Sequence, residues 1–203
     1  MQKSIIQRVE DYVQLLITEK TPSGNFYHNL EHTKDVVNSA IEIALGEKVN
    51  PDDMDIIQIS AWFHDAGYVE KSNGHEELSA MFASNFLTEE NYPSEKIEEI
   101  VNCILATKVP QEPKNHFQKI ICDADLNHIG RKIFFLRNDK FRMEFQNHSN
   151  RKLTEYEWLT KTIDFVTHHH FFTDYAIKTF LNQKNENIKI LQEQLDKVLN
   201  QTR

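Results

Sequence analysis

Apolar residues recur at intervals of three and four along most of the chain, which is the pattern of amphipathic α-helices. The first stripe runs through Ile5, Val9, Val13 and Leu16 and stops before the turn at 21–24. Further helices are expected within 36–44, 54–63, 78–87, 97–105, 155–167 and 185–200. Gly and Pro number only five each, which also suits helices. The sequence therefore predicts an all-α fold.

The stretch from Asn50 to Gly67 predicts a buried central helix. Asn50 suits the N-cap, Pro51 suits the first helical position, and the acids Asp52 and Asp53 face the positive end of the helix dipole. The second half of the stretch is apolar around nearly its whole circumference, as in a helix surrounded by other helices. Gly67 is expected to end the helix.

His64 and Asp65 stand side by side at the end of this apolar stretch. Burying an imidazole and a carboxylate costs several kcal/mol unless each is paired, protonated or bound to a metal. A bound cation would remove that cost. A buried hydrogen bond between the two side chains would do so as well, and the pair alone does not decide between them.

The chain has 203 residues and 39% hydrophobic content, which is enough for one well-buried core and little for two. We therefore expect a single domain over residues 1–203. The helix at about 185–200 is expected to dock on that domain rather than on a partner helix. The alternative is an interaction module that uses this helix, and a homodimer stays open.

The chain is acidic, with 23 Lys and Arg against 31 Asp and Glu and a formal charge of -8. This charge opposes nonspecific binding to nucleic acids and to anionic membranes. A small anionic substrate stays compatible with it where a metal supplies local positive charge. The sequence also lacks a Gly-rich phosphate loop, a Gly-x-Ser-x-Gly elbow and a zinc-type cysteine cluster.

Cellular location is predicted from cysteines and hydropathy. Cys103 and Cys122 form no Cys-x-x-Cys pair and are too few for a disulfide framework, which favours a reducing compartment. No uncharged run approaches the roughly 18 residues that a membrane span requires. Charges also interrupt the first residues before a signal-peptide core can form. We expect a cytoplasmic protein without membrane contact.

Histidines and acids elsewhere extend the candidate chemistry. Asn29 suits the cap of a helix whose first turn contains His32, while His28 lies just outside that helix, where a proton donor would be useful. Surface or capping roles are the alternative for both histidines. Asp123 and Asp125 would lie about 200° apart on a helix, so at most one of them faces a given site.

Basic residues offer candidate contacts to a phosphate. Lys108 ends a helical stripe and either points at an anionic substrate or lies in solvent. Arg142 belongs to a segment rich in aromatic and basic residues, in which core aromatics are favoured over single-stranded nucleic-acid binding. Arg142 stays a candidate phosphate contact. The roles of Glu76, Glu77 and the histidine tract at 168–170 are left open.

Four motifs together resemble the HD superfamily of metal-dependent phosphohydrolases. They are Tyr27-His28-Asn29-x-x-His32, Trp62-Phe63-His64-Asp65, Ile104-Leu105-Ala106-Thr107-Lys108 and Asp123-Ala124-Asp125-Leu126. The resemblance covers most of the chain from about residue 26. Within that superfamily the chain resembles the bacterial predicted metal-dependent HD phosphohydrolases, whose members have an Arg-x-Glu-aromatic element similar to 142–145. The segment 28–36 is also similar to cyclic-nucleotide phosphodiesterases, but this chain has a lysine where they have an acid, at position 108.

The resemblance implies an HD-type bundle with a divalent metal ion. Its ligands would be His32, His64, Asp65 and Asp125, with Asp123 in a supporting role. Mixed nitrogen and oxygen ligation suits manganese, iron, cobalt, nickel or zinc better than calcium, and magnesium stays among the candidates.

The implied reaction is hydrolysis of a phosphate ester or anhydride by a metal-activated water. His28 and Asp65 would be the catalytic residues, with His28 giving a proton to the leaving group. Lys108 and Arg142 would hold phosphoryl oxygens of a small phosphorylated substrate, for which a nucleotide is one candidate. The competing hypothesis is a non-enzymatic HD-fold domain that binds or senses a nucleotide.

Overall fold

The structure is a computed structural model that describes residues 3–149 and 151–201. All regular secondary structure in those residues is helical, which confirms the predicted all-α fold. The chain divides into two compact units at Leu126, an N-terminal unit and a C-terminal unit that begins at Asn127. Compact units need not fold independently, so the single domain stays a prediction.

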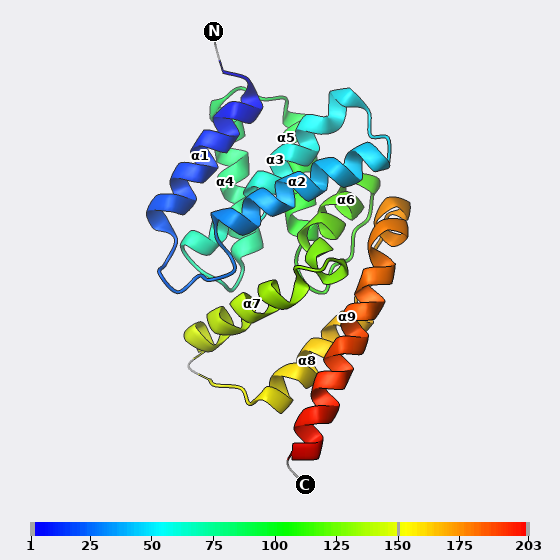
Figure 1. Cartoon of the computed structure of the whole chain (residues 1–203). Helices are drawn as coiled ribbons and strands as arrows, with labels where there is room; N and C mark the ends of the chain where they lie inside the picture. The colour runs from blue at the N-terminus through cyan, green and yellow to red at the C-terminus, as the bar shows by residue number, and fades with distance from the viewer. Residues whose placement is uncertain (1–2, 150, 202–203) are drawn as a thin grey trace. The chain divides into compact units, whose positions relative to one another are not determined.

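The N-terminal unit is built from six α-helices and two short 3-10 helices among the described residues. Their bounds are α1 Ile5–Lys20, α2 Leu30–Gly46, η1 Pro51–Asp53, α3 Met54–Phe63, η2 Ala66–Val69, α4 His75–Glu89, α5 Ser94–Ala106 and α6 His116–Asp125. Helix α3 contacts α1, α2, α4, α5 and α6, and Figure 1 shows it among its neighbours. This arrangement confirms the predicted buried central helix.

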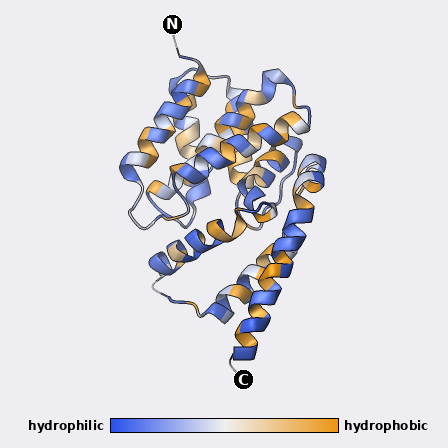
Figure 2. Ribbon diagram, in the orientation of Figure 1, coloured by the Kyte–Doolittle hydropathy of each residue, from blue (hydrophilic) through white to orange (hydrophobic). Residues whose placement is uncertain are grey.

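Side-chain caps explain where several of these helices begin. The Asn29 carboxamide oxygen accepts hydrogen bonds from the backbone N–H groups of Glu31 and His32 at the start of α2, as predicted. Ser4 and Gln7 form a reciprocal capping box at the start of α1. Figure 2 shows hydrophobic and hydrophilic residues alternating along α1, as expected of a helix with one buried face.

The predicted end of the central helix at Gly67 is wrong. Helix α3 ends at Phe63, and Gly67 lies inside η2. The glycine has a different purpose, because a Cβ atom at this position would lie 2.2 Å from the backbone oxygen of His75. The Gly67 N–H also donates to Ser79 Oγ at 2.8 Å. Gly67 therefore allows the start of α4 to approach the chain just after His64 and Asp65.

The C-terminal unit contains η3 Asn127–Gly130, α7 Phe134–Ser149, α8 Glu155–His168 and α9 Asp174–Gln201. Helix α9 includes the stretch 185–200 that was expected to be helical, and it contacts α8 and η3. The buried Asn187 of α9 donates hydrogen bonds to the backbone oxygens of Ile129 and Arg131 at 2.9 and 3.0 Å. These bonds connect the end of the unit to its beginning.

A helix that spans a bilayer must be both long and apolar. None of the described helices joins sufficient length to sufficient hydropathy for a membrane span.

Candidate metal centre

Four predicted site residues come from three helices of the N-terminal unit. His32 lies in the first turn of α2, His64 and Asp65 directly follow α3, and Asp125 is the last residue of α6. His32 and His64 are 3% and 0% exposed, whereas the Asp125 side chain keeps 15% of its surface in solvent. The cluster of acids and imidazoles is therefore mostly buried, and Asp125 is its most solvent-exposed member.

Three of these side chains have the geometry of a metal-binding group. The Nε2 atoms of His32 and His64 lie 3.4 Å apart, and Asp125 Oδ1 lies 3.5 Å from the first and 3.7 Å from the second. All three ligand atoms fall within 4.8 Å of one another. They could hold one ion between them.

Asp65 also lies close to both imidazoles. Its Oδ2 lies 3.3 Å from His32 Nε2 and 3.2 Å from His64 Nε2. Yet among the described residues this buried oxygen accepts no hydrogen bond of good geometry. A buried carboxylate oxygen without a partner is costly, so the atom fits a ligand of a cation.

The hydrogen bonding of His64 supports the same conclusion. Its Nδ1 lies 2.8 Å from the Ala61 carbonyl oxygen, which only accepts, so Nδ1 carries a hydrogen. In the neutral ring, Nε2 then has a free lone pair directed toward His32. Metal-ligating histidines are usually held in this way, through a hydrogen bond from the other ring nitrogen. The residues present thus fit a divalent cation.

Electrostatics favour positive charge at the centre of the cluster. Burial works against the charged His32 imidazole, but the neighbouring carboxylates of Asp125 and Asp65 outweigh it and raise the pKa of His32 to about 9. Burial likewise works against the charged Asp65 carboxylate, and the neighbouring His64 and His32 nevertheless hold its pKa well below the usual range. Two acids acting on two imidazoles attract either protons or a metal ion.

His28 lies beside the cluster, where the sequence predicted it. Its ring stacks on Tyr68 with centroids 3.8 Å apart and planes 9° from parallel. The centroid of His32 is 5.9 Å away from that of His28. Stacking restricts the orientation of the His28 ring, so a proton donor at this position would be preorganised. The catalytic role of His28 stays a prediction.

Comparison with known proteins places the chain in a family. Residues 29–129 match the model of the HD domain. The chain belongs to the HD superfamily. The matched segment contains four of the site residues already described, namely His32, His64, Asp65 and Asp125.

A solved structure shares the HD fold of this chain. It is the crystal structure of a predicted HD superfamily hydrolase from an uncultured Thermotogales bacterium, with a TM-score of 0.64. The two chains are 19% identical, and the likeness covers 94% of this chain and 91% of the other. At this identity the comparison supports the fold. No protein with a curated description matches the chain.

His75 is a member of the HD site that the sequence did not predict. Its Nε2 lies 3.3 Å from Asp65 Oδ1, and its Nδ1 lies 2.8 Å from the Ser72 carbonyl oxygen. Burial opposes the charged His75 ring, but the hydrogen bond to Asp65 outweighs it and raises the pKa of His75. The buried Glu76 also approaches the His75 ring, at 3.5 Å. A histidine in the first turn of α4 offered no sequence signal beyond helix capping.

Gln111 is a second unpredicted neighbour of the site. Its Nε2 donates to Asp125 Oδ2 at 3.2 Å. The sequence contained no sign of this contact, because Gln111 lies in the irregular segment between α5 and α6. Asp123 is fully buried and lies outside the group of three metal-ligand atoms, and its supporting role stays a prediction.

Lys108 is paired rather than free in solvent. Its Nζ lies 2.6 Å from Glu77 Oε1, and the two side chains are 57% and 52% exposed. This contact gives Glu77 a partner that the sequence had not indicated. A role for Lys108 in substrate binding stays a prediction.

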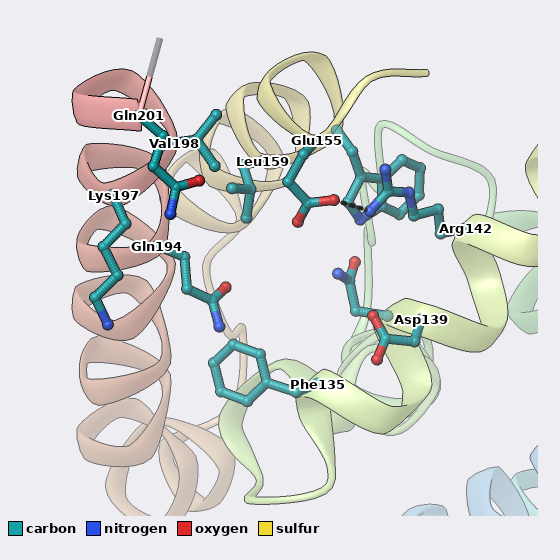
Figure 3. A pocket seen from close by; sticks show the side chains of 11 residues that line it. Phe135, Asp139, Arg142, Glu155, Leu159, Gln194, Lys197, Val198 and Gln201 are labelled. Atoms are coloured by element: carbon teal, nitrogen blue, oxygen red, sulfur yellow. Dashed lines mark hydrogen bonds and ion pairs between the residues drawn. The ribbon is translucent and has the colours of Figure 1, made fainter. Parts of the chain in front are cut away.

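Arg142 belongs to the C-terminal unit. Its guanidinium pairs with Glu155, donates to the Leu153 carbonyl oxygen at 3.2 Å and lies 5.7 Å from the centre of the Trp158 ring. A pocket of about 380 Å³ lies between α7, α8 and α9. Arg142 and Glu155 are among the side chains that line it (Figure 3). The predicted contact of Arg142 with a phosphate is not tested by these contacts and stays a prediction.

Proposed function

We propose that the chain is a metal-dependent phosphohydrolase that cleaves a phosphate ester or anhydride of a small substrate. One observation carries the proposal: two buried imidazole Nε2 atoms face each other at 3.4 Å, with carboxylate oxygens of Asp65 and Asp125 beside them. These four side chains suit the ligation of a cation better than hydrogen bonding to one another. Membership of the HD superfamily supports the same assignment.

The chemistry of the donor atoms limits which metal ions can bind. Two imidazoles and two carboxylates leave open positions on a six-coordinate ion, which a water and a substrate oxygen can take. Nitrogen ligands favour manganese, iron, cobalt, nickel or zinc over calcium, and magnesium is retained because carboxylates also suit it. His32, His64, Asp65 and Asp125 would hold the ion.

A divalent cation held there would lower the pKa of a bound water to about 7 and would offset the negative charge that develops on phosphorus. His28, in its protonated form, gives a proton from a ring nitrogen to the leaving oxygen. The stack with Tyr68 keeps that ring in one orientation during the transfer. Burial of His32 and His64 excludes bulk water and strengthens each charge interaction.

Lys108 and Arg142 are the proposed contacts for phosphoryl oxygens. Lys108 would exchange its exposed partner Glu77 for the substrate, since an exposed ion pair is readily broken. Arg142 would have to leave Glu155 in the same way. A higher KM in Lys108→Ala and in Arg142→Ala, with kcat little changed, supports these two assignments.

The proposal is tested by removing and restoring the metal. Chelator-treated protein is reloaded separately with manganese, iron, cobalt, nickel, zinc or magnesium and assayed on phosphomonoesters, phosphodiesters, nucleotides and sugar phosphates. We expect turnover with at least one metal and none in the chelated protein. Asp65→Ala should lose both bound metal and turnover, because it removes a ligand. Asp52→Ala, which changes an exposed carboxylate of the same unit, is the matched control.

The same assay distinguishes the alternative of a nucleotide sensor. A sensing domain would bind a nucleotide in equilibrium dialysis without hydrolysing it, whichever metal is loaded. Turnover that persists unchanged in Asp65→Ala would remove the assignment of the site.

A further inference from the structure

Gln111 makes a directed contact with a proposed metal ligand. The residue lies between α5 and α6, and its Nε2 donates to Asp125 Oδ2 at 3.2 Å and to the Thr107 carbonyl oxygen at 3.5 Å. Both partners are acceptors, so the amide has only one favourable orientation. Turned by 180°, its oxygen would face a carboxylate oxygen and a carbonyl oxygen.

The other end of the same amide is left without a partner. Gln111 Oε1 is buried and accepts no hydrogen bond among the described residues. Buried amide oxygens are normally paired. Gln111 is instead oriented so that its nitrogen donates to Asp125 and its oxygen has no hydrogen bond among the described residues. This asymmetry points to donation to Asp125 as the purpose of the side chain.

The contact determines which oxygen of Asp125 faces the imidazoles. Oδ1 is the atom that lies 3.5 Å from His32 Nε2 and 3.7 Å from His64 Nε2, whereas Oδ2 is held by Gln111. We propose that Gln111 is a positioning residue that presents Asp125 to the metal through Oδ1 alone. The inference rests on the proposed function, since it concerns the ion that those four ligands would hold.

Two variants of Gln111 test the proposal with a readout that does not depend on turnover. Gln111→Leu and Gln111→Met both keep the approximate volume and remove the donor. Glu112→Ala is the matched control, because Glu112 is the exposed neighbour in the same segment. Zinc and manganese affinities are measured on the full chain by competition with a chromogenic chelator. The melting temperature of each metal-free protein is recorded beside them.

We expect both Gln111 variants to bind metal about 10- to 100-fold more weakly than the parent, as for other hydrogen bonds to metal ligands. Glu112→Ala should stay within about two-fold. A parent that binds metal beside a Gln111→Leu variant of equal affinity would overturn the inference. So would a lower melting temperature of the metal-free variant with unchanged affinity, since Gln111 would then only anchor the segment. Should Gln111→Leu fail to fold, Gln111→Met carries the test.

The result also separates this inference from the proposed function. A parent chain that binds no divalent metal contradicts the metal centre itself, and the positioning role fails with it. A parent that binds metal through a Gln111-dependent site but hydrolyses nothing in the substrate panel contradicts only the hydrolase. The role of Gln111 would stand in that case.

Discussion

Asp65 and Gln111 each bury an oxygen that accepts no hydrogen bond among the described residues. An unpaired buried acceptor costs about 1–3 kcal/mol, and folded proteins contain few of them. Asp65 Oδ2 lies 3.2 Å from His64 Nε2, and Gln111 donates to Asp125 at 3.2 Å. Two such oxygens at one cluster are understandable if the cluster binds an additional group instead of pairing all of its own polar atoms.

The thiol of Cys103 should be unreactive in the folded protein. Burial, and after it the charge of Glu99, raise the pKa of Cys103, so the neutral thiol is present at pH 8. Cys122 is also fully buried. We expect almost no reaction with a disulfide reagent at pH 8 in the native state and two thiols per chain in denaturant, because the thiolate is the reactive form. Rapid native-state labelling of Cys103, located by peptide mass, would contradict this.

The sequence identified a site residue only where its type and its immediate neighbours were informative. His64 and Asp65 were recognisable as adjacent polar residues in an apolar helix, whereas Asp125 was chosen over Asp123 only by the family resemblance. His75 and Gln111 were not recognisable, because their significance comes only from contacts made across the fold, at Asp65 Oδ1 and Asp125 Oδ2. A single sequence contains no periodicity that reports such contacts.

Helix starts were more predictable than helix ends. The start of α2 follows from Asn29, whose side chain satisfies two backbone donors locally. The end of α3 was misjudged, since Gly67 resembled a stop signal but permits a close approach of α4 instead. A cap is a local interaction and can be read from neighbouring residues. An approach of two helices depends on the tertiary fold.

Capping of α2 should matter to the metal site as well as to stability. Asn29→Ala leaves the backbone N–H groups of Glu31 and His32 without their side-chain acceptor, at a cost of about 1 kcal/mol in the free energy of unfolding. Because His32 lies in that turn, metal affinity should fall too. Ser4→Ala removes the cap of α1 and should lower stability without changing metal affinity. Urea unfolding and chelator competition measure the two quantities, and equal affinities in both variants would contradict the expectation.

At the scale of the whole molecule, the candidate ligands belong to one of two compact units. His32, His64, Asp65 and Asp125 all precede the division at Leu126. Composition could not indicate this division, because no run of polar, Gly or Pro residues separates the units in the sequence. The fold class was predictable from hydrophobic periodicity, whereas the grouping of helices depends on which surfaces pack together.

Two glycines provide a matched test of whether the metal centre depends on the N-terminal unit alone. An added Cβ at Gly67 would meet the His75 backbone oxygen at 2.2 Å, and one at Gly130 would meet Phe180 Cβ at 2.5 Å. Each Gly→Ala change should lower stability by about 1–3 kcal/mol through overpacking. Only Gly67→Ala displaces the start of α4 beside Asp65, so only that variant should bind zinc or manganese more weakly well below its melting temperature. Equal loss of affinity in Gly130→Ala would mean that the C-terminal unit contributes to the centre.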